Sequence, residues 1–153
     1  MRTSDGIVLG GGAAGVLDIV AACIVSWPRV PPERVLQYIA SGALGPAAFR
    51  GGMPAALAGL AFHFVIATGA AAVYAALSRR WPVLIHRPLL YGPLFGLAVY
   101  ATMNLVVLPL SRVSRQPPSW SSIMTMSAIH IVCVGLPIAL AIAFAARSAR
   151  RMA

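Results

Sequence analysis

The chain has 153 residues, of which 59% are apolar and 10% are charged. A soluble domain carries about 25% charged residues, so this composition excludes a mostly water-facing surface and indicates a membrane protein. The net charge of +9 comes from arginine, since the sequence has no lysine. The arginines lie in short clusters between apolar runs, as lipid-headgroup anchors do, whereas a nucleic-acid-binding protein gathers them on one folded surface. We therefore expect no nucleic-acid partner.

Four apolar runs are long enough to cross a bilayer, whose core of about 30 Å needs about 20 helical residues. They cover residues 7–27, 53–77, 89–110 and 123–146. Barrel strands would be shorter and would alternate between polar and apolar residues, which these runs do not. The sequence therefore predicts an all-α integral membrane protein, a single domain over residues 1–153 with a bundle of four transmembrane helices.

The first run could instead be part of a secretory signal peptide, with Arg2 as its positively charged start. Asp18 would interrupt the apolar region of such a peptide, and the run continues to Trp27, beyond the usual length of about 7–15 residues. We therefore favour a transmembrane helix that the protein keeps.

Two connections between the runs differ in character. Residues 32–45 predict a short helix, which cannot span a membrane and is expected to lie along the interface or pack on the bundle. Its apolar face has Val35, Leu36, Ile39, Ala40 and Leu44, and its other face has Arg34, Gln37, Tyr38 and Ser41. Residues 111–122 are polar, contain a proline pair and predict an irregular surface loop.

The ends of the runs indicate how the protein lies in a membrane. Trp27, Trp81 and Trp120 fall at the predicted interfaces, as an aromatic belt would place them. Pro137 lies deep in the last run and predicts a kink there. An orientation with both termini in the cytoplasm puts seven arginines inside and five outside, an excess that favours this orientation in a bacterial inner membrane. The inner set is Arg2, Arg79, Arg80, Arg87, Arg147, Arg150 and Arg151, and the outer set is Arg29, Arg34, Arg50, Arg112 and Arg115.

Each run carries a polar residue that is costly in lipid. Asp18 lies near the middle of the first run, where a carboxylate costs about 2.5–3.5 kcal/mol on insertion scales. We expect it to face the bundle interior and to meet His63, Asn104 and His130 from the other runs. Small residues at helical spacing let helices approach closely. The predicted packing positions are Gly11, Gly15, Gly59, Gly92 and Gly96.

This polar centre has three interpretations. It can be a structural network that ties the helices together, at roughly 0.6–2 kcal/mol per contact. It can be a protonatable pair of Asp18 with a histidine that binds or relays a proton or cation, in a bundle that forms a homodimer or joins a larger membrane complex. As an alternative, His63 and His130 could hold a b-type haem in an electron carrier.

Other chemistry has little support in the sequence. There is no Gly-rich phosphate loop, nucleophile elbow or carboxylate pair, so we do not expect an enzyme. No His-x-x-x-His or Cys-x-x-Cys spacing favours a metal site. Cys23 and Cys133 are expected at different depths, which favours two free thiols over a disulfide.

Gly-x-x-x-Gly followed by a polar residue occurs in both the first and the third run, and the stretches after His63 and His130 are alike. This likeness would fit a parallel two-helix repeat with its axis along the membrane normal.

Several stretches resemble a group of small bacterial inner-membrane proteins with four helices and no assigned function. These stretches are AGVLDIV, PERVLQYIASGALGPAAFRGG, GLAFHFVIA, MNLVVLPLS and GLPIAL. The resemblance extends from about Gly11 to Ala141. It implies the same four-helix architecture and supplies no activity, cofactor or catalytic residue.

Overall fold

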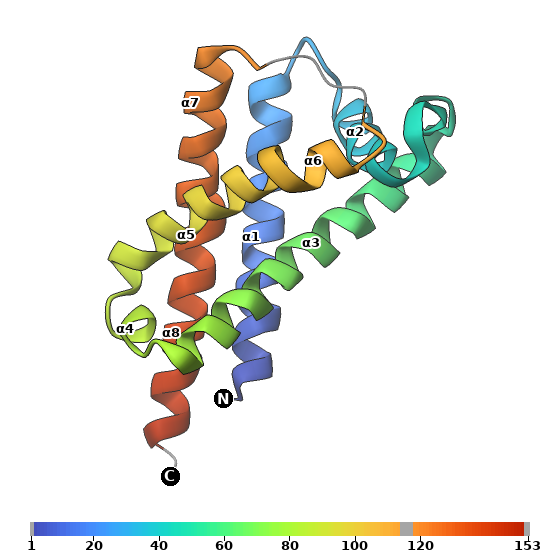
Figure 1. The fold of residues 1–153 in the computed structure, drawn as a ribbon. Helices are drawn as coiled ribbons and strands as arrows, with labels where there is room; N and C mark the ends of the chain where they lie inside the picture. Colours follow the sequence, from blue (N-terminus) through green and yellow to red (C-terminus); the bar gives the residue numbers. More distant parts are fainter. Residues whose placement is uncertain (1, 114–117, 152–153) are drawn as a thin grey trace.

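The computed structural model describes residues 2–113 and 118–151, and the regular structure in these ranges is helical. By length and composition, four helices could cross a membrane: α1 (Thr3–Ser26), α3 (Gly52–Arg80), the helix Pro88–Leu110 and the helix Trp120–Ala149. Figure 1 shows α1 beside the long helix from α7 to α8, with α3 and α5 running obliquely across them. Both ends of the described chain lie at the same end of the bundle. The prediction of four long apolar helices is confirmed.

Two of these four helices are built from several segments. The third consists of α5 (Pro88–Thr102), a π-helical turn η2 (Met103–Val107) and α6 (Leu108–Leu110). The fourth consists of α7 (Trp120–Ile129), a second π-helical turn η3 (His130–Gly135) and α8 (Leu136–Arg151).

The connections contain α2 (Pro32–Leu44), a 3-10 helix η1 (Gly45–Arg50) and the short α4 (Val83–His86). Residues 114–117 in the predicted surface loop, and Arg115 with them, lie outside the described residues, as do the side chains of Arg150 and Arg151.

Polar capping residues extend two helices beyond the apolar runs. The first run begins at residue 7, but α1 begins at Thr3, where Asp5 Oδ2 accepts a 2.8 Å hydrogen bond from the Arg2 backbone N–H. The last run begins at residue 123, but α7 begins at Trp120, where Ser119 Oγ accepts from the Ser122 N–H at 3.2 Å. A satisfied N-cap supplies a partner for donors that the first turn leaves free, so a helix can start outside its apolar stretch.

The helix predicted between the first two runs is α2, which packs on α3. Its buried residues come from both predicted faces, since Ala40 is fully buried and Gln37 and Ser41 are each 2% exposed, whereas Leu44 of the predicted apolar face is 47% exposed. The predicted division of this helix into an apolar and a polar face is therefore wrong at Gln37, Ser41 and Leu44. Gln37 Nε2 donates to the Gly52 carbonyl at 3.1 Å and to Glu33 Oε1 at 2.9 Å. The side-chain amide thus ties α2 to the first residue of α3, which explains why a polar residue occupies the contact.

The predicted packing glycines on α1 and α3 all lie at helix contacts. A Cβ atom at Gly11 would come within 2.7 Å of the Thr68 Cα, and a Cβ atom at Gly15 within 2.7 Å of the Phe64 ring. A Cβ atom at Gly59 would overlap the Leu36 carbonyl of α2. Glycine is therefore required where α1 meets α3 and where α2 meets α3.

The predicted packing glycines on α5 fit against the last helix. A Cβ atom at Gly92 would come within 3.1 Å of the Gly135 carbonyl oxygen, and one at Gly96 would overlap the carbonyl of His130. Gly135 presents its own Cα to Gly92 and Gly96. The Gly-x-x-x-Gly pair of α1 thus packs on α3, and that of α5 packs on η3 and α8.

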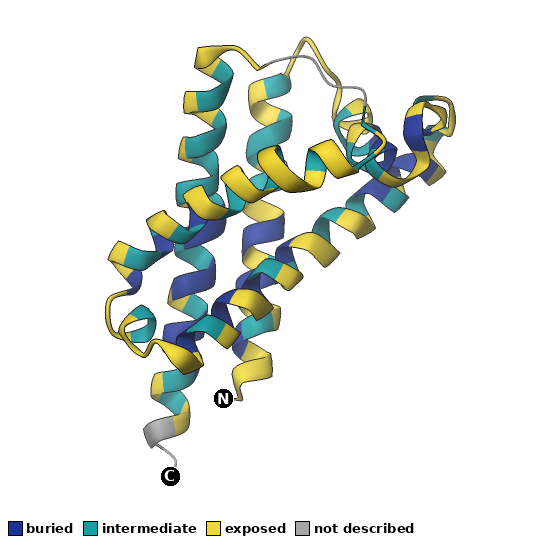
Figure 2. Cartoon of the chain, in the orientation of Figure 1, coloured by how far each residue is buried: buried dark blue, intermediate teal, exposed yellow. Residues whose placement is uncertain are grey.

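The hydrophobic core cluster lies in the half of the molecule that contains the termini (Figure 2). Its core is built from Ala14, Ala71, Tyr74, Ala75, Val134, Ile138, Ala139 and Ile142. Small residues let α1 and α8 approach, since a Cβ atom at Gly10 would come within 3.2 Å of the Ile138 Cα. The outward faces of the long helices are apolar and exposed, with Leu105 76% and Val65 70% exposed.

Candidate functional site

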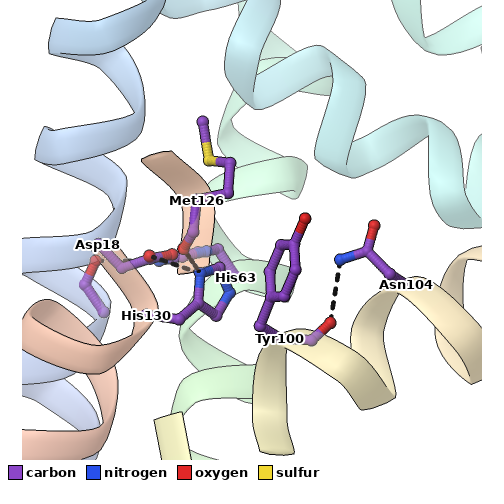
Figure 3. A network of polar contacts seen from close by, with 7 residues as sticks. Asp18, His63, Tyr100, Asn104, Met126 and His130 are labelled. Carbon is purple, nitrogen blue, oxygen red and sulfur yellow. Dashed lines mark hydrogen bonds and ion pairs between the residues drawn. The ribbon is translucent and has the colours of Figure 1, made fainter. Parts of the chain in front are cut away.

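Asp18 lies between two histidines from different helices (Figure 3). Its Oδ2 atom is 3.9 Å from His63 Nε2 on α3, and its Oδ1 atom is 3.9 Å from His130 Nδ1 at the start of η3. The three side chains are 13–17% exposed. We refer to Asp18, His63 and His130 as the carboxylate–histidine cluster. The structure thus brings together three of the four polar residues predicted to meet.

Both histidines use the nitrogen that faces Asp18 to bond to a backbone carbonyl. His63 Nε2 is 2.9 Å from the Gly15 oxygen, and His130 Nδ1 is 2.9 Å from the Met126 oxygen. A carbonyl oxygen only accepts hydrogen bonds, so each of these nitrogens carries a hydrogen. The distance of 3.9 Å to Asp18 is beyond hydrogen-bond range. Among the described residues, the Asp18 carboxylate therefore has two close positive dipoles but receives no hydrogen bond.

Asn104, the fourth predicted residue, joins the cluster through Tyr100. Its Nδ2 atom donates to the Tyr100 carbonyl at 2.9 Å, and the Tyr100 ring packs edge-on against the His130 ring with centroids 5.3 Å apart. The role of Tyr100 is not evident from the sequence, because an aromatic residue in an apolar run has no pattern that assigns it to a polar centre.

Asn104 and His130 both lie in π-helical turns, and each turn ends just before a proline. The Leu108 N–H donates to the Met103 carbonyl and the Leu136 N–H to the Ile131 carbonyl, five residues back in each case. Pro109 and Pro137 follow directly; proline cannot donate and clashes with the carbonyl four residues earlier, which the wider turn relieves. The distortion predicted at Pro137 is thus a π turn, and the one before Pro109 was not predicted. π turns are frequent at functional sites.

The carboxylate–histidine cluster lines the inner end of a cavity of about 560 Å³. Ala14, Ala67 and Val134 close this end, next to the packed core. From there the cavity extends along α1 to Ser26 and on to Arg34 and Tyr38 of α2, away from the termini. Between these ends its wall is largely apolar. The volume is in the range of sites for small molecules, and no pattern in the sequence predicts such a cavity.

Arg34 marks the other end of the cavity and is held in place by α2 and η1. Its Nη1 atom donates to the Phe49 carbonyl at 2.7 Å and to Gln37 Oε1 at 3.2 Å. Its guanidinium carbon also lies 5.9 Å from the centroid of the Phe49 ring, within the distance of a cation–π contact. Asp18 and Arg34 are the formally charged side chains among the described residues that line the cavity.

In the neutral form, each histidine has a second ring nitrogen without a hydrogen, because the nitrogen that faces the backbone carbonyl carries the hydrogen of the ring. These nitrogens, His63 Nδ1 and His130 Nε2, are the atoms that could accept a proton or bind a haem iron.

The described part of the chain has no group of three or more His, Cys, Asp or Glu side chains placed to hold a metal ion. Cys23 and Cys133 are free thiols, as the sequence favoured.

Comparison with protein-family models, with curated proteins and with solved structures finds no match for this chain. The class of protein therefore has to be inferred from the helices and the cavity themselves.

Proposed function

We propose that this chain is an integral protein of a bacterial inner membrane, with four transmembrane helices and both termini in the cytoplasm. The length and apolar composition of the four long helices support this. So do the exposed apolar side chains around the bundle, such as Leu105 and Val65, because a surface of this kind in water is a site of association. Trp27, Trp81 and Trp120 lie at ends of these helices, where a membrane interface would place them.

Within this membrane protein, the carboxylate–histidine cluster serves proton-linked transport of a cation or small solute. The observation that carries this proposal is the position of Asp18, 3.9 Å from both histidines at the inner end of the cavity. An ionisable residue inside a membrane is costly and by default marks an ion or substrate pathway. Imidazole exchanges protons in the neutral pH range, which suits coupling to a proton gradient.

The cluster only has to bind and release protons. A proton from the cavity binds to Asp18 or to the ring nitrogen of His63 or His130 that lacks a hydrogen. Each proton bound makes the cluster more positive by one unit and changes its attraction for a charged ligand. Between the cluster and the terminal end lies the packed core, so release on that side requires the helices that build this core to move apart.

Vesicles that contain the purified protein and an internal pH-sensitive dye test this proposal. With a membrane potential imposed, we expect proton uptake by the wild type and uptake close to that of protein-free vesicles for Asp18→Asn and His63→Ala. His86→Ala is the matched control, because His86 is exposed on α4 and lies outside the cavity. If the wild type shows no uptake above protein-free vesicles, transport by this chain alone is refuted, and an accessory subunit of a larger complex becomes the better interpretation.

A further inference from the structure

We infer that the cavity binds a hydrophobic organic cation whose charged group lies beside Asp18. This inference rests on the proposed transport function and names the class of substrate.

The negative charge of the cavity is at its inner end. Asp18 and Arg34 are its formally charged lining residues in the part of the chain that the structure describes, and they lie at opposite ends. A ligand that reaches the inner end therefore meets a carboxylate in mostly apolar surroundings, where the attraction between opposite charges is much stronger than in water.

The Asp18 carboxylate is available to such a ligand. The N–H groups of His63 and His130 that face it already donate to the carbonyls of Gly15 and Met126. A carboxylate that is removed from bulk water without hydrogen bonds is unfavourable, and a cation beside it offsets that cost. Asp18 thus differs from Asp5, whose carboxylate accepts a hydrogen bond at the start of α1.

Arg34 is less available to an anionic ligand. Its guanidinium group is engaged by the Phe49 carbonyl, by Gln37 Oε1 and by the Phe49 ring. These contacts hold α2 to η1 and use the donors of Nη1. The two charged ends of the cavity therefore favour a cation at Asp18 over an anion at Arg34.

The walls and the size of the cavity indicate an organic cation. Ile66, Val99, Met103 and Met126 line the cavity around the cluster, and the Tyr100 ring faces the same space. Aromatic rings and methionines suit a hydrophobic cation. A volume of about 560 Å³ far exceeds what an inorganic ion needs, and among the described residues no set of three metal-ligating side chains is assembled.

Binding of such a cation should compete with protons. The titratable side chains close to Asp18 are His63 from α3, Tyr100 from α5, and His130 and Cys133 from η3, and the cavity's other charged group is Arg34. Protonation of Asp18 removes the negative charge, and protonation of either histidine adds a positive one. Each of these steps weakens the binding of a cation and strengthens that of an anion.

Equilibrium binding of tetraphenylphosphonium and tetraphenylborate to the detergent-purified protein tests the inference. The two ions are alike in size and shape and differ in the sign of their charge, so the borate controls for simple partitioning into apolar surroundings. We expect the wild type to bind the phosphonium more tightly, and Asp18→Asn to weaken this binding by about tenfold or more. We expect His86→Ala to leave it within about twofold, because His86 is exposed on α4 and lies outside the cavity.

A measurement on the wild type alone does not depend on the folding of a variant. As the pH falls from about 8 to about 5, the range in which histidine changes its charge, the affinity for the phosphonium should fall. A pH-independent affinity, or tighter binding of the borate that is lost in Arg34→Gln, would overturn the inference. Proton uptake by vesicles without phosphonium binding would leave the proposed function standing and refute this substrate class. Phosphonium binding that depends on Asp18, without proton uptake, would support the site and refute proton-linked transport.

Discussion

The carbonyl group of His130 lies against the Cα atom of Gly96, in the space that a Cβ atom at position 96 would occupy. This contact joins the packing of α5 to the carboxylate–histidine cluster, because the same residue that presents its carbonyl to Gly96 presents its imidazole to Asp18. The position of a helix-packing glycine therefore sets the position of a polar side chain in the cavity.

Gly96→Ala is expected to damage both packing and the cluster. The added methyl group has to push η3 away from α5, since the atoms it meets belong to the backbone and cannot rotate aside. We expect a loss of about 1–3 kcal/mol in stability, seen as a lower unfolding temperature in detergent, and a loss of proton uptake.

Gly12→Ala is the matched control for this variant, because nothing lies within 4 Å of a Cβ atom at position 12 of α1. Its unfolding temperature should stay at or above that of the wild type. Equal effects of the two alanines would contradict the close contact at Gly96.

Asp18→Asn separates a functional cluster from a structural one. The carboxylate receives no hydrogen bond from the described residues, so removing its charge should leave the stability unchanged or raise it by about 1 kcal/mol. If Asp18 served only to tie the helices, the same change would cost roughly 0.6–2 kcal/mol. Thermal unfolding of the wild type and of Asp18→Asn in the same detergent measures the difference. A clear decrease in stability would favour the structural network.

Gln37→Ala should loosen α2 from α3. The substitution removes the 3.1 Å hydrogen bond to the Gly52 carbonyl, and an unsatisfied buried group costs about 1–3 kcal/mol. Faster proteolysis within residues 45–51, followed by mass spectrometry, would report the loosening. Tyr38→Ala, on the exposed side of the same helix, should leave the cleavage rate at the wild-type level.

The absorption spectrum tests the haem alternative directly. If the carboxylate–histidine cluster is the proton site proposed above, its histidines are not iron ligands, and we expect no Soret band from protein purified out of cells supplied with a haem precursor. A band that shifts on reduction with dithionite and disappears in His63→Ala or His130→Ala would identify a cytochrome and displace the proposed transport function.

The long helices were predictable because the hydrophobic effect depends on the composition of a segment, which can be read directly from the sequence. Runs of apolar residues identify each helix to within a few residues, and the differences at Thr3 and Trp120 come from caps outside the apolar runs. The meeting of Asp18 with both histidines was also predictable, since residues so costly in lipid must face one another. The two π turns, the part played by Tyr100 and the cavity were not, as each depends on how neighbouring helices pack rather than on the residues of one helix.

Pro137→Ala tests whether the π turn is needed to place His130. Without the proline, the Cys133 carbonyl can accept an ordinary helical hydrogen bond, and η3 is free to tighten into an α-helix. Removing the π turn would rotate the part of the helix before the turn by about 100° about the helix axis, relative to the part after it. His130 would then no longer face Asp18, while Ile138 would remain in the core. We expect a fold at least as stable as the wild type, because a helix breaker has been removed, together with a proton uptake close to that of His130→Ala. Unchanged uptake in a stable Pro137→Ala protein would show that the π turn is not needed to hold the cluster.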